Sequence, residues 1–185
     1  MKHSPHIEPE LSRPLPVDKI SAGGVEEYLI ASPAERKALA ARFDLIDLPK
    51  LEANLNIDHA SNGKMIAVTG KLSAKVVQQC VVTLEPLETQ IDDEINILYA
   101  PAHFLDKGAG PPHVDSGEDE APEPIVNGII DLGELVAQHL AIAINPYPRK
   151  EGAVLENIET TAAEPSDSSL NPFAKLAEFK KKAIK

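Results

Sequence analysis

Three long runs of alternating apolar and polar residues in the middle of the chain constrain its fold most strongly. The first run covers residues 51–58, a turn follows at residues 59–63, and two further runs cover residues 66–76 and 87–99. Strict alternation places one face of a strand in a core and the other in water, which is typical of antiparallel sheets. The sequence therefore predicts a sheet with one buried and one solvated face.

The polar positions of the third run are rich in acid. Asp92 and Glu94 point to the solvated face of the predicted strand, while Asp93 alternates to the other face. A catalytic carboxylate pair would need to converge on a substrate, whereas two of these three residues face solvent. We therefore interpret Asp92 and Glu94 as candidates for binding a partner.

Two helices are expected around the sheet. The Ser-Pro-Ala-Glu sequence at residues 32–35 predicts a capping box, and this helix should end near Arg42. The second helix should begin at a cap formed by Asp131 and stop before Asn145-Pro146. Because Ile142 lies off its apolar stripe, this helix is expected to be buried on more than one side.

Composition divides the chain into four parts. Residues 1–13 are expected to form a flexible N-terminal arm, and residues 14–150 a single α+β domain with short early strands and a mobile acidic loop at 106–124. Residues 151–170 are interpreted as a linker, and residues 171–185 as a basic C-terminal segment with a short helix. The expected fold is a mainly antiparallel sheet, either open or curled toward a barrel, packed by the two helices.

The charge balance favours a cationic partner. Among 185 residues, 18 are Lys or Arg and 29 are Asp or Glu, giving a formal net charge of -11. Such a chain is repelled by a phosphate backbone unless its basic residues are segregated, as they are at the C-terminal end. Further candidate partner-binding residues are therefore the acids Glu118, Asp119 and Glu120 of the loop and the lysines Lys175, Lys180, Lys181 and Lys182.

No pattern in the sequence predicts catalysis. Cys80 is the single cysteine, the six histidines include no pair spaced for a zinc-binding helix, and no phosphate-binding or nucleophile motif is present. We expect no catalytic residue, metal, cofactor or small-molecule substrate. The N-terminus lacks the apolar core of a signal peptide, and the apolar stretch at residues 135–144 is too short to span a bilayer. A cytoplasmic protein without membrane attachment is expected.

Several segments together resemble the YceD family, the large ribosomal RNA subunit accumulation proteins of bacteria and plastids. They are the Cys-Val-Val-Thr-Leu-Glu-Pro sequence at residues 80–86, the helix and proline-rich exit at residues 130–148, and the Asn-Pro-Phe-Ala-Lys-Leu sequence at residues 171–176. Many members carry a second cysteine where this chain has Thr83, so a thiolate metal site is not carried over. The resemblance implies a role in accumulation of large-subunit ribosomal RNA and identifies no catalytic residue.

Three functions remain open at this point. The first is a non-enzymatic factor in large-subunit biogenesis that binds a ribosomal protein, large-subunit ribosomal RNA, or both. The second is an RNA-binding module that uses the sheet, for which the predicted strands offer only Tyr28 and Tyr99 as aromatic residues. The third is an RNA-processing enzyme, which would require a role for Asp93, His139 or Cys80.

Overall fold

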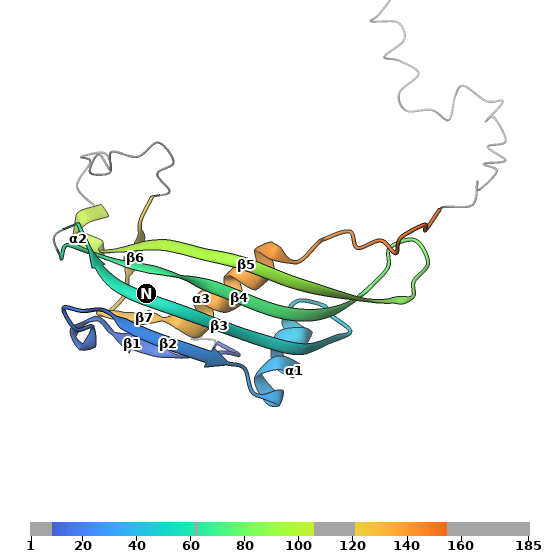
Figure 1. The fold of residues 1–185 in the computed structure, drawn as a ribbon, viewed down its shortest axis with the longest axis horizontal. Helices are drawn as coiled ribbons and strands as arrows, with labels where there is room; N and C mark the ends of the chain where they lie inside the picture. Colours follow the sequence, from blue (N-terminus) through green and yellow to red (C-terminus); the bar gives the residue numbers. More distant parts are fainter. Residues whose placement is uncertain (1–8, 62, 106–120, 155–185) are drawn as a thin grey trace, which may run out of the picture. The chain divides into compact units, whose positions relative to one another are not determined.

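A five-stranded sheet forms the centre of the structure. The computed structural model describes residues 9–61, 63–105 and 121–154, and its elements belong to one compact unit that ends at Ala153. The strands of the sheet are, in spatial order, β2 (Val25–Ile30), β3 (Asp47–Ala60), β4 (Met65–Gln79), β5 (Pro86–Pro101) and β6 (Glu123–Ile125). The first four are antiparallel neighbours, and β6 runs parallel to β5 (Figure 1).

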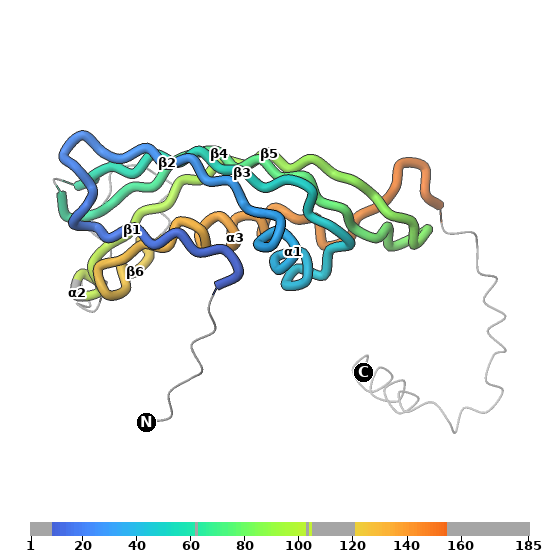
Figure 2. Tube along the Cα trace, turned by 90° about the horizontal axis from the view of Figure 1, so that it is seen from below, coloured from blue at the N-terminus to red at the C-terminus, as the bar shows by residue number. Residues whose placement is uncertain are grey.

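Two helices and a small second sheet cover one face of this sheet. The helices are α1 (Pro33–Arg42) and α3 (Leu132–Ala143), and the second sheet pairs β1 (Pro14–Pro16) antiparallel with β7 (Ile129–Asp131). A short 3-10 helix, η1 (Val17–Lys19), follows β1, and a four-residue helix, α2 (Ala102–Leu105), follows β5. Figure 2 shows α1, α3 and β1 on the same side of the five strands. Within the described ranges, no helix or strand covers the opposite face, which we call the open face.

The core is aliphatic and lies between the sheet and these elements. Every second residue is buried against it from Leu51 to Ile57 in β3 and from Leu72 to Gln78 in β4, as the alternation predicts. Its largest fully buried side chains are Leu11, Leu39, Leu48, Leu51, Leu55, Ile57, Leu72, Ile95, Ile130, Leu140, Val68 and Val76. No helix in the described part of the chain is long and apolar enough to cross a membrane.

The α+β class, the antiparallel sheet and the two helices are confirmed, but curling into a barrel is wrong. The sheet has two ends, β2 and β6, and these strands do not pair with each other. Both helix starts agree with their sequence signals. Ser32 and Glu35 form the reciprocal capping box, and the Asp131 side chain caps α3.

The N-terminal expectations need two corrections. Leu11 is fully buried and packs in the core, so the part of the proposed flexible arm nearest the domain is folded. The first of the expected short early strands covers only Pro14–Pro16, because the chain then turns into η1, where the Ile20 N–H donates to the Val17 carbonyl.

Two later expectations also differ from the structure. The proposed acidic loop does not extend to residue 124, because Glu123–Ile125 forms β6 and pairs with Tyr99–Pro101 of β5. Residues 106–120 lie outside the described residues. Ile142 is 82% exposed, so α3 is not buried all round. Ile142 lies in the last turn of the helix, beyond the last fully buried residue, Leu140.

Candidate functional site

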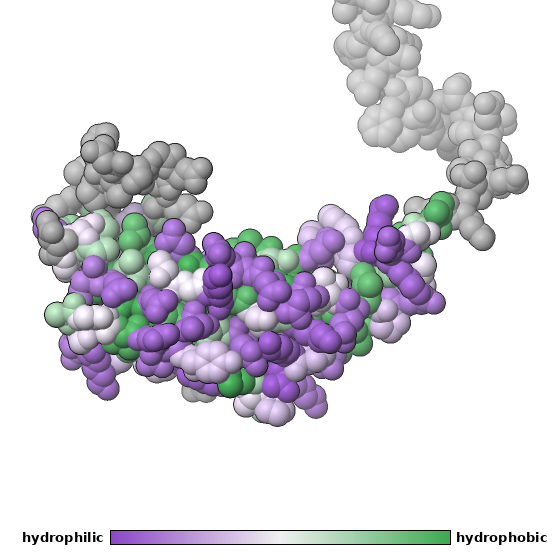
Figure 3. Space-filling view, viewed as in Figure 1, coloured by the Kyte–Doolittle hydropathy of each residue, from purple (hydrophilic) through white to green (hydrophobic). Residues whose placement is uncertain are grey.

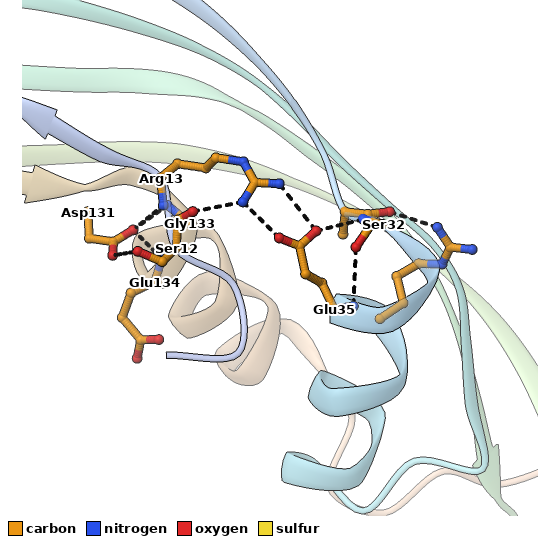
Figure 4. Close-up of polar contacts among 9 residues, drawn as sticks. Ser12, Arg13, Ser32, Glu35, Asp131, Gly133 and Glu134 are labelled. Carbon is orange, nitrogen blue, oxygen red and sulfur yellow. Dashed lines mark hydrogen bonds and ion pairs between the residues drawn. The ribbon is translucent and has the colours of Figure 1, made fainter. Parts of the chain in front are cut away.

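The Asp131 carboxylate joins the N-terminal segment to α3 (Figure 4). One of its oxygens accepts the N–H groups of Gly133 and Glu134 at the helix N-terminus, at 3.0 and 3.2 Å, and the Arg13 N–H at 2.7 Å. The other accepts the Ser12 hydroxyl at 2.6 Å. This carboxylate therefore satisfies helix donors that would otherwise be unpaired and is engaged in holding the fold.

Arg13 extends this network to the start of α1. Its guanidinium binds both oxygens of Glu35, at 2.8 and 3.2 Å, and the same carboxylate accepts the Ser32 N–H at 2.7 Å (Figure 4). The Arg13 hydrogen bond is the main reason that the pKa of Glu35 falls to about 2. Glu35 is thus a structural carboxylate that remains ionised well below its usual range.

Replacing Glu35 by glutamine should make stability less dependent on pH. A carboxylate whose folded pKa is lowered stabilises the protein above about pH 4.5 and loses this contribution as the pH falls toward 2. Because Arg13 is 42% exposed, we expect E35Q to lower the free energy of unfolding at pH 7 by only about 1 kcal/mol. Urea denaturation at pH 7 and in steps down to pH 3 measures this difference, which should shrink with the pH. E26Q, at an unpaired exposed glutamate, is the control, and a pH-independent difference for E35Q would contradict the assignment.

A second arginine connects the two helices from the same side. Arg42, at the end of α1, binds both oxygens of Glu134 in α3, at 2.9 Å each, and Glu10 at 2.9 Å. The Arg42 hydrogen bond lowers the pKa of Glu134. Arg13 and Arg42 are paired with three carboxylates, those of Glu35, Glu10 and Glu134, so this network holds the layers together and leaves neither arginine free to bind an anionic partner.

The open face carries charges of both signs, and Figure 3 shows it as largely hydrophilic. Its three lysines each lie beside a carboxylate: Lys50 by Glu52 at 3.0 Å, Lys71 by Glu94 at 3.8 Å, and Lys75 by Glu88 at 2.7 Å. The pair of Lys71 and Glu94 is long and its side chains are 80% and 82% exposed, so its attraction is weak.

Among the predicted partner-binding residues that the structure describes, Asp92 is the one without an ion pair. It lies on the open face opposite Ser73, and its carboxylate accepts a hydrogen bond from Gln90 at 3.2 Å. Within the described ranges it forms no ion pair, and the same holds for Glu26 and Asp58 on this face. Asp93 faces the helix side, opposite Leu72, and is partly buried, so the structure separates it from Asp92 and Glu94.

The remaining predicted binding residues cannot be placed. The loop acids Glu118, Asp119 and Glu120 and the lysines Lys175, Lys180, Lys181 and Lys182 lie outside the described residues. Of the two tyrosines considered for RNA stacking, Tyr28 is 62% exposed on the open face, but Tyr99 is 7% exposed and belongs to the core. Burial raises the pKa of the Tyr99 hydroxyl. A platform formed by both rings is therefore absent.

Cys80 organises the turn between β4 and β5. Its sulfur is fully buried and accepts the N–H groups of Thr83 at 3.4 Å and Lys150 at 3.3 Å. Hydrogen bonds from the Thr83 side chain and backbone, and then from Lys150, lower the pKa of the thiol to about 6. The Val81 N–H also binds the Pro148 carbonyl, so the turn fastens the segment that leaves α3.

Substitution of Cys80 should reveal this fastening role. In C80A the Thr83 and Lys150 N–H groups lose their acceptor, which should cost about 1–3 kcal/mol of unfolding free energy. C80S retains an acceptor of similar size and should lose less. Thermal or urea unfolding of the two variants checks the order, and equal losses would show that packing rather than hydrogen bonding matters here.

A groove between β1 and β2 was not predicted from the sequence. It has a volume of about 530 Å³ and is lined by Arg13, Pro14, Leu15, Glu27, Tyr28, Leu29, Ile30, Leu55 and Leu132. The sequence held one signal for it: Tyr28 and Ile30 are large side chains at alternate positions of a short strand, on the face that is exposed to solvent. Among the described residues, no group of three His, Cys, Asp or Glu is placed to hold a metal ion.

The structure is thus that of an α+β protein with an open polar face, unpaired carboxylates on that face and a groove beside β2. The family model for the large ribosomal RNA subunit accumulation protein YceD matches residues 68–180. Because this match covers more than half of the chain, the protein belongs to the YceD family. All three segments that carry the sequence resemblance lie wholly within this matched region. Searches of curated proteins and of solved structures gave no match.

Proposed function

We propose that this protein supports the accumulation of large-subunit ribosomal RNA without catalysing a reaction, by binding a basic ribosomal protein. Membership of the YceD family, whose description names this RNA, is the observation that carries the proposal. The open face supports the mode of action, because carboxylates outnumber lysines on it and Asp92, Glu26 and Asp58 form no ion pair within the described residues.

The excess of carboxylate on the open face would affect the association rate of a basic protein more than the stability of the complex. Ribosomal proteins are rich in Lys and Arg, and a face with excess carboxylate raises their association rate and keeps them from nonspecific contacts with RNA. Such attraction weakens as salt screens it over about 10 Å at 0.1 M ionic strength. The lysines of residues 171–185 could then contact ribosomal RNA while the folded unit holds the protein.

Direct RNA binding through the sheet is the second candidate. Lys50, Lys71 and Lys75 lie on the same open face as the exposed Tyr28, so this face offers three cations and one stacking ring to RNA. Each lysine, however, lies next to a carboxylate, and Tyr99 is buried. The balance of charge on this face therefore favours a basic protein over RNA.

Depletion of the protein in cells tests the proposal. We expect fewer large subunits in sucrose-gradient profiles and less large-subunit ribosomal RNA, with small-subunit levels retained. The tagged full-length chain should capture large-subunit proteins at low salt and lose them at high salt. Unchanged subunit profiles, together with capture of no ribosomal component at either salt, would refute the proposal. Capture of ribosomal RNA by a chain ending at residue 170 would favour the second candidate.

A further inference from the structure

The outer edge of β2 offers backbone groups without partners. The Ala31 N–H donates to the Leu51 carbonyl at 3.0 Å, so the residues that exchange hydrogen bonds with β3 are Ala31 and, by alternation, Leu29 and Glu27. The N–H and carbonyl groups of Glu26, Tyr28 and Ile30 therefore point away from the sheet. Within the described residues, β2 pairs only with β3, which leaves these groups unsatisfied by other protein atoms.

β1 borders the same groove but cannot complete this edge. The Arg13 carbonyl accepts the Leu132 N–H, so Arg13 faces β7. By alternation, Leu15 is the residue of β1 that exchanges hydrogen bonds with β7. Pro14 and Pro16 are consequently the residues directed toward the groove, and proline has no N–H to donate. A direct ladder between β1 and β2 would lack half of its donors, which accounts for the gap of about 530 Å³ between them.

The groove has an apolar floor and an acidic rim. Leu29, Leu55 and Leu132 line its bottom, and Tyr28 and Ile30, which are 62% and 54% exposed, stand on its open side. Glu26 and Glu27 of β2 are exposed and form no ion pair among the described residues, whereas the one cation at the groove, Arg13, is neutralised by Glu35. The charge presented to an occupant is therefore negative.

We propose that this groove binds an extended basic segment of a protein partner, which adds to β2 as an extra strand. Backbone hydrogen bonds to Glu26, Tyr28 and Ile30 would supply affinity, and alternate side chains would supply specificity. Apolar side chains of the segment would enter the groove toward Leu29, and Lys or Arg side chains would lie beside Glu26 and Tyr28. This inference rests on the proposed function and specifies which part of a ribosomal protein is recognised.

The opposite edge of the sheet is a poorer site for the same purpose. The outward-directed residues of β5 include Glu88, Asp92 and Glu94, but Glu88 and Glu94 already lie beside Lys75 and Lys71 of β4. This edge therefore offers a basic strand less unpaired charge than Glu26 and Glu27 do at β2. The pocket at that edge contains the apolar residues Ile91, Ile142 and Ala143, but the rest of its lining is polar and Ile142 is 82% exposed, whereas Leu29 and Leu55 are buried.

A blocked octapeptide of alternating valine and lysine is the probe, with a valine–glutamate octapeptide as its control. Hydrogen exchange followed by NMR on the full chain should show slower exchange of the Glu26, Tyr28 and Ile30 amides with the lysine peptide only. Protection of the β5 edge instead, or no protection of β2 at a millimolar concentration of the peptide, would overturn the proposal. Protection of β2 in the free protein accompanied by dimers in sedimentation would also overturn it, in favour of a second copy as the occupant.

Substitution of Tyr28 by proline distinguishes the contribution of its backbone N–H to peptide binding from that of its side chain. Y28P removes the outward N–H without touching the hydrogen bonds to β3, while Y28A removes the same ring and keeps the N–H. We expect Y28P to bind the lysine peptide about tenfold more weakly than Y28A does. If Y28P does not fold, E27K is the second variant, and we expect it to bind the lysine peptide more weakly than the wild-type protein does. Equal binding by Y28P, Y28A and E27K would refute strand addition. Because subunit profiles are a separate readout, that result would leave the proposed function standing.

Discussion

Replacing Gly133 by valine should lower the free energy of unfolding by about 3 kcal/mol or more. A Cβ atom at this position would lie 2.7 Å from the Leu11 carbonyl oxygen and 2.9 Å from the Ser12 nitrogen. Both atoms belong to backbone that is fixed, because Leu11 is fully buried and the Ser12 side chain binds Asp131. The N-terminal segment would have to move off α3, which costs packing and the helix cap together.

The direction of the stability change caused by alanine at this position distinguishes a steric clash from helix propensity. In an ordinary exposed helix, glycine to alanine raises stability by up to about 1 kcal/mol. At Gly133 we expect G133A to lower it instead, by less than G133V does. Urea denaturation of both variants measures the effect, with A141V as a control at an exposed position of the same helix. A stabilising G133A would mean that the N-terminal segment does not cross α3 closely.

The three long strands of the sheet could be predicted because their signal is local, whereas the strand order could not. Alternation over β3, β4 and β5 is a property of consecutive residues, and one buried face forces the register that pairs them. The capping box of Ser32 and the cap at Asp131 likewise depend on residues only two or three positions apart in the sequence. The three predicted runs lie within β3, β4 and β5, which extend beyond them by one to four residues at each end.

The contacts that the sequence could not reveal join distant parts of the chain. Arg13 and Glu35 meet only once α1 is packed, and Arg42 reaches Glu134 across 92 positions. The N-terminal segment reads as polar and proline-rich, yet the burial of one residue, Leu11, fixes it to the core. Pro14 and Pro16, which directly follow the expected arm, lie in β1, where a missing N–H is tolerated at an edge.

The candidate site was predicted only in part for the same reason. The solvated positions of Asp92 and Glu94 follow from alternation, and the structure places both on the open face. The lysines opposite them come from β3 and β4, and the pairing register that brings Lys71 beside Glu94 is set by the tertiary fold. The groove at β2 depends on which backbone groups remain unpaired, and a side-chain pattern does not encode this.

Reversing the charge of Asp92 and Glu94 should weaken binding of basic ribosomal proteins strongly at low salt. The D92K/E94K variant would place two more ammonium groups beside Lys71 and Lys75 and turn the excess of carboxylate on the open face into an excess of cation. Because steering by charge acts mainly on association, we expect the association rate to fall about tenfold or more at low salt, with a smaller change at high salt. Stability should change little, since both residues are exposed.

The probe for this prediction is the set of large-subunit proteins freed of ribosomal RNA, measured by surface plasmon resonance on the full chain. D18K/E151K has the same net charge and alters two exposed acids outside the five-stranded sheet, so it separates a local effect of the open face from a general effect of charge. We expect this control to retain at least half of the wild-type rate. Equal losses in the two variants would assign the attraction to net charge alone, and faster association of D92K/E94K with the same proteins would contradict an acidic binding face. A gain in affinity of D92K/E94K for protein-free ribosomal RNA is expected in any case, because the reversal removes repulsion from phosphate.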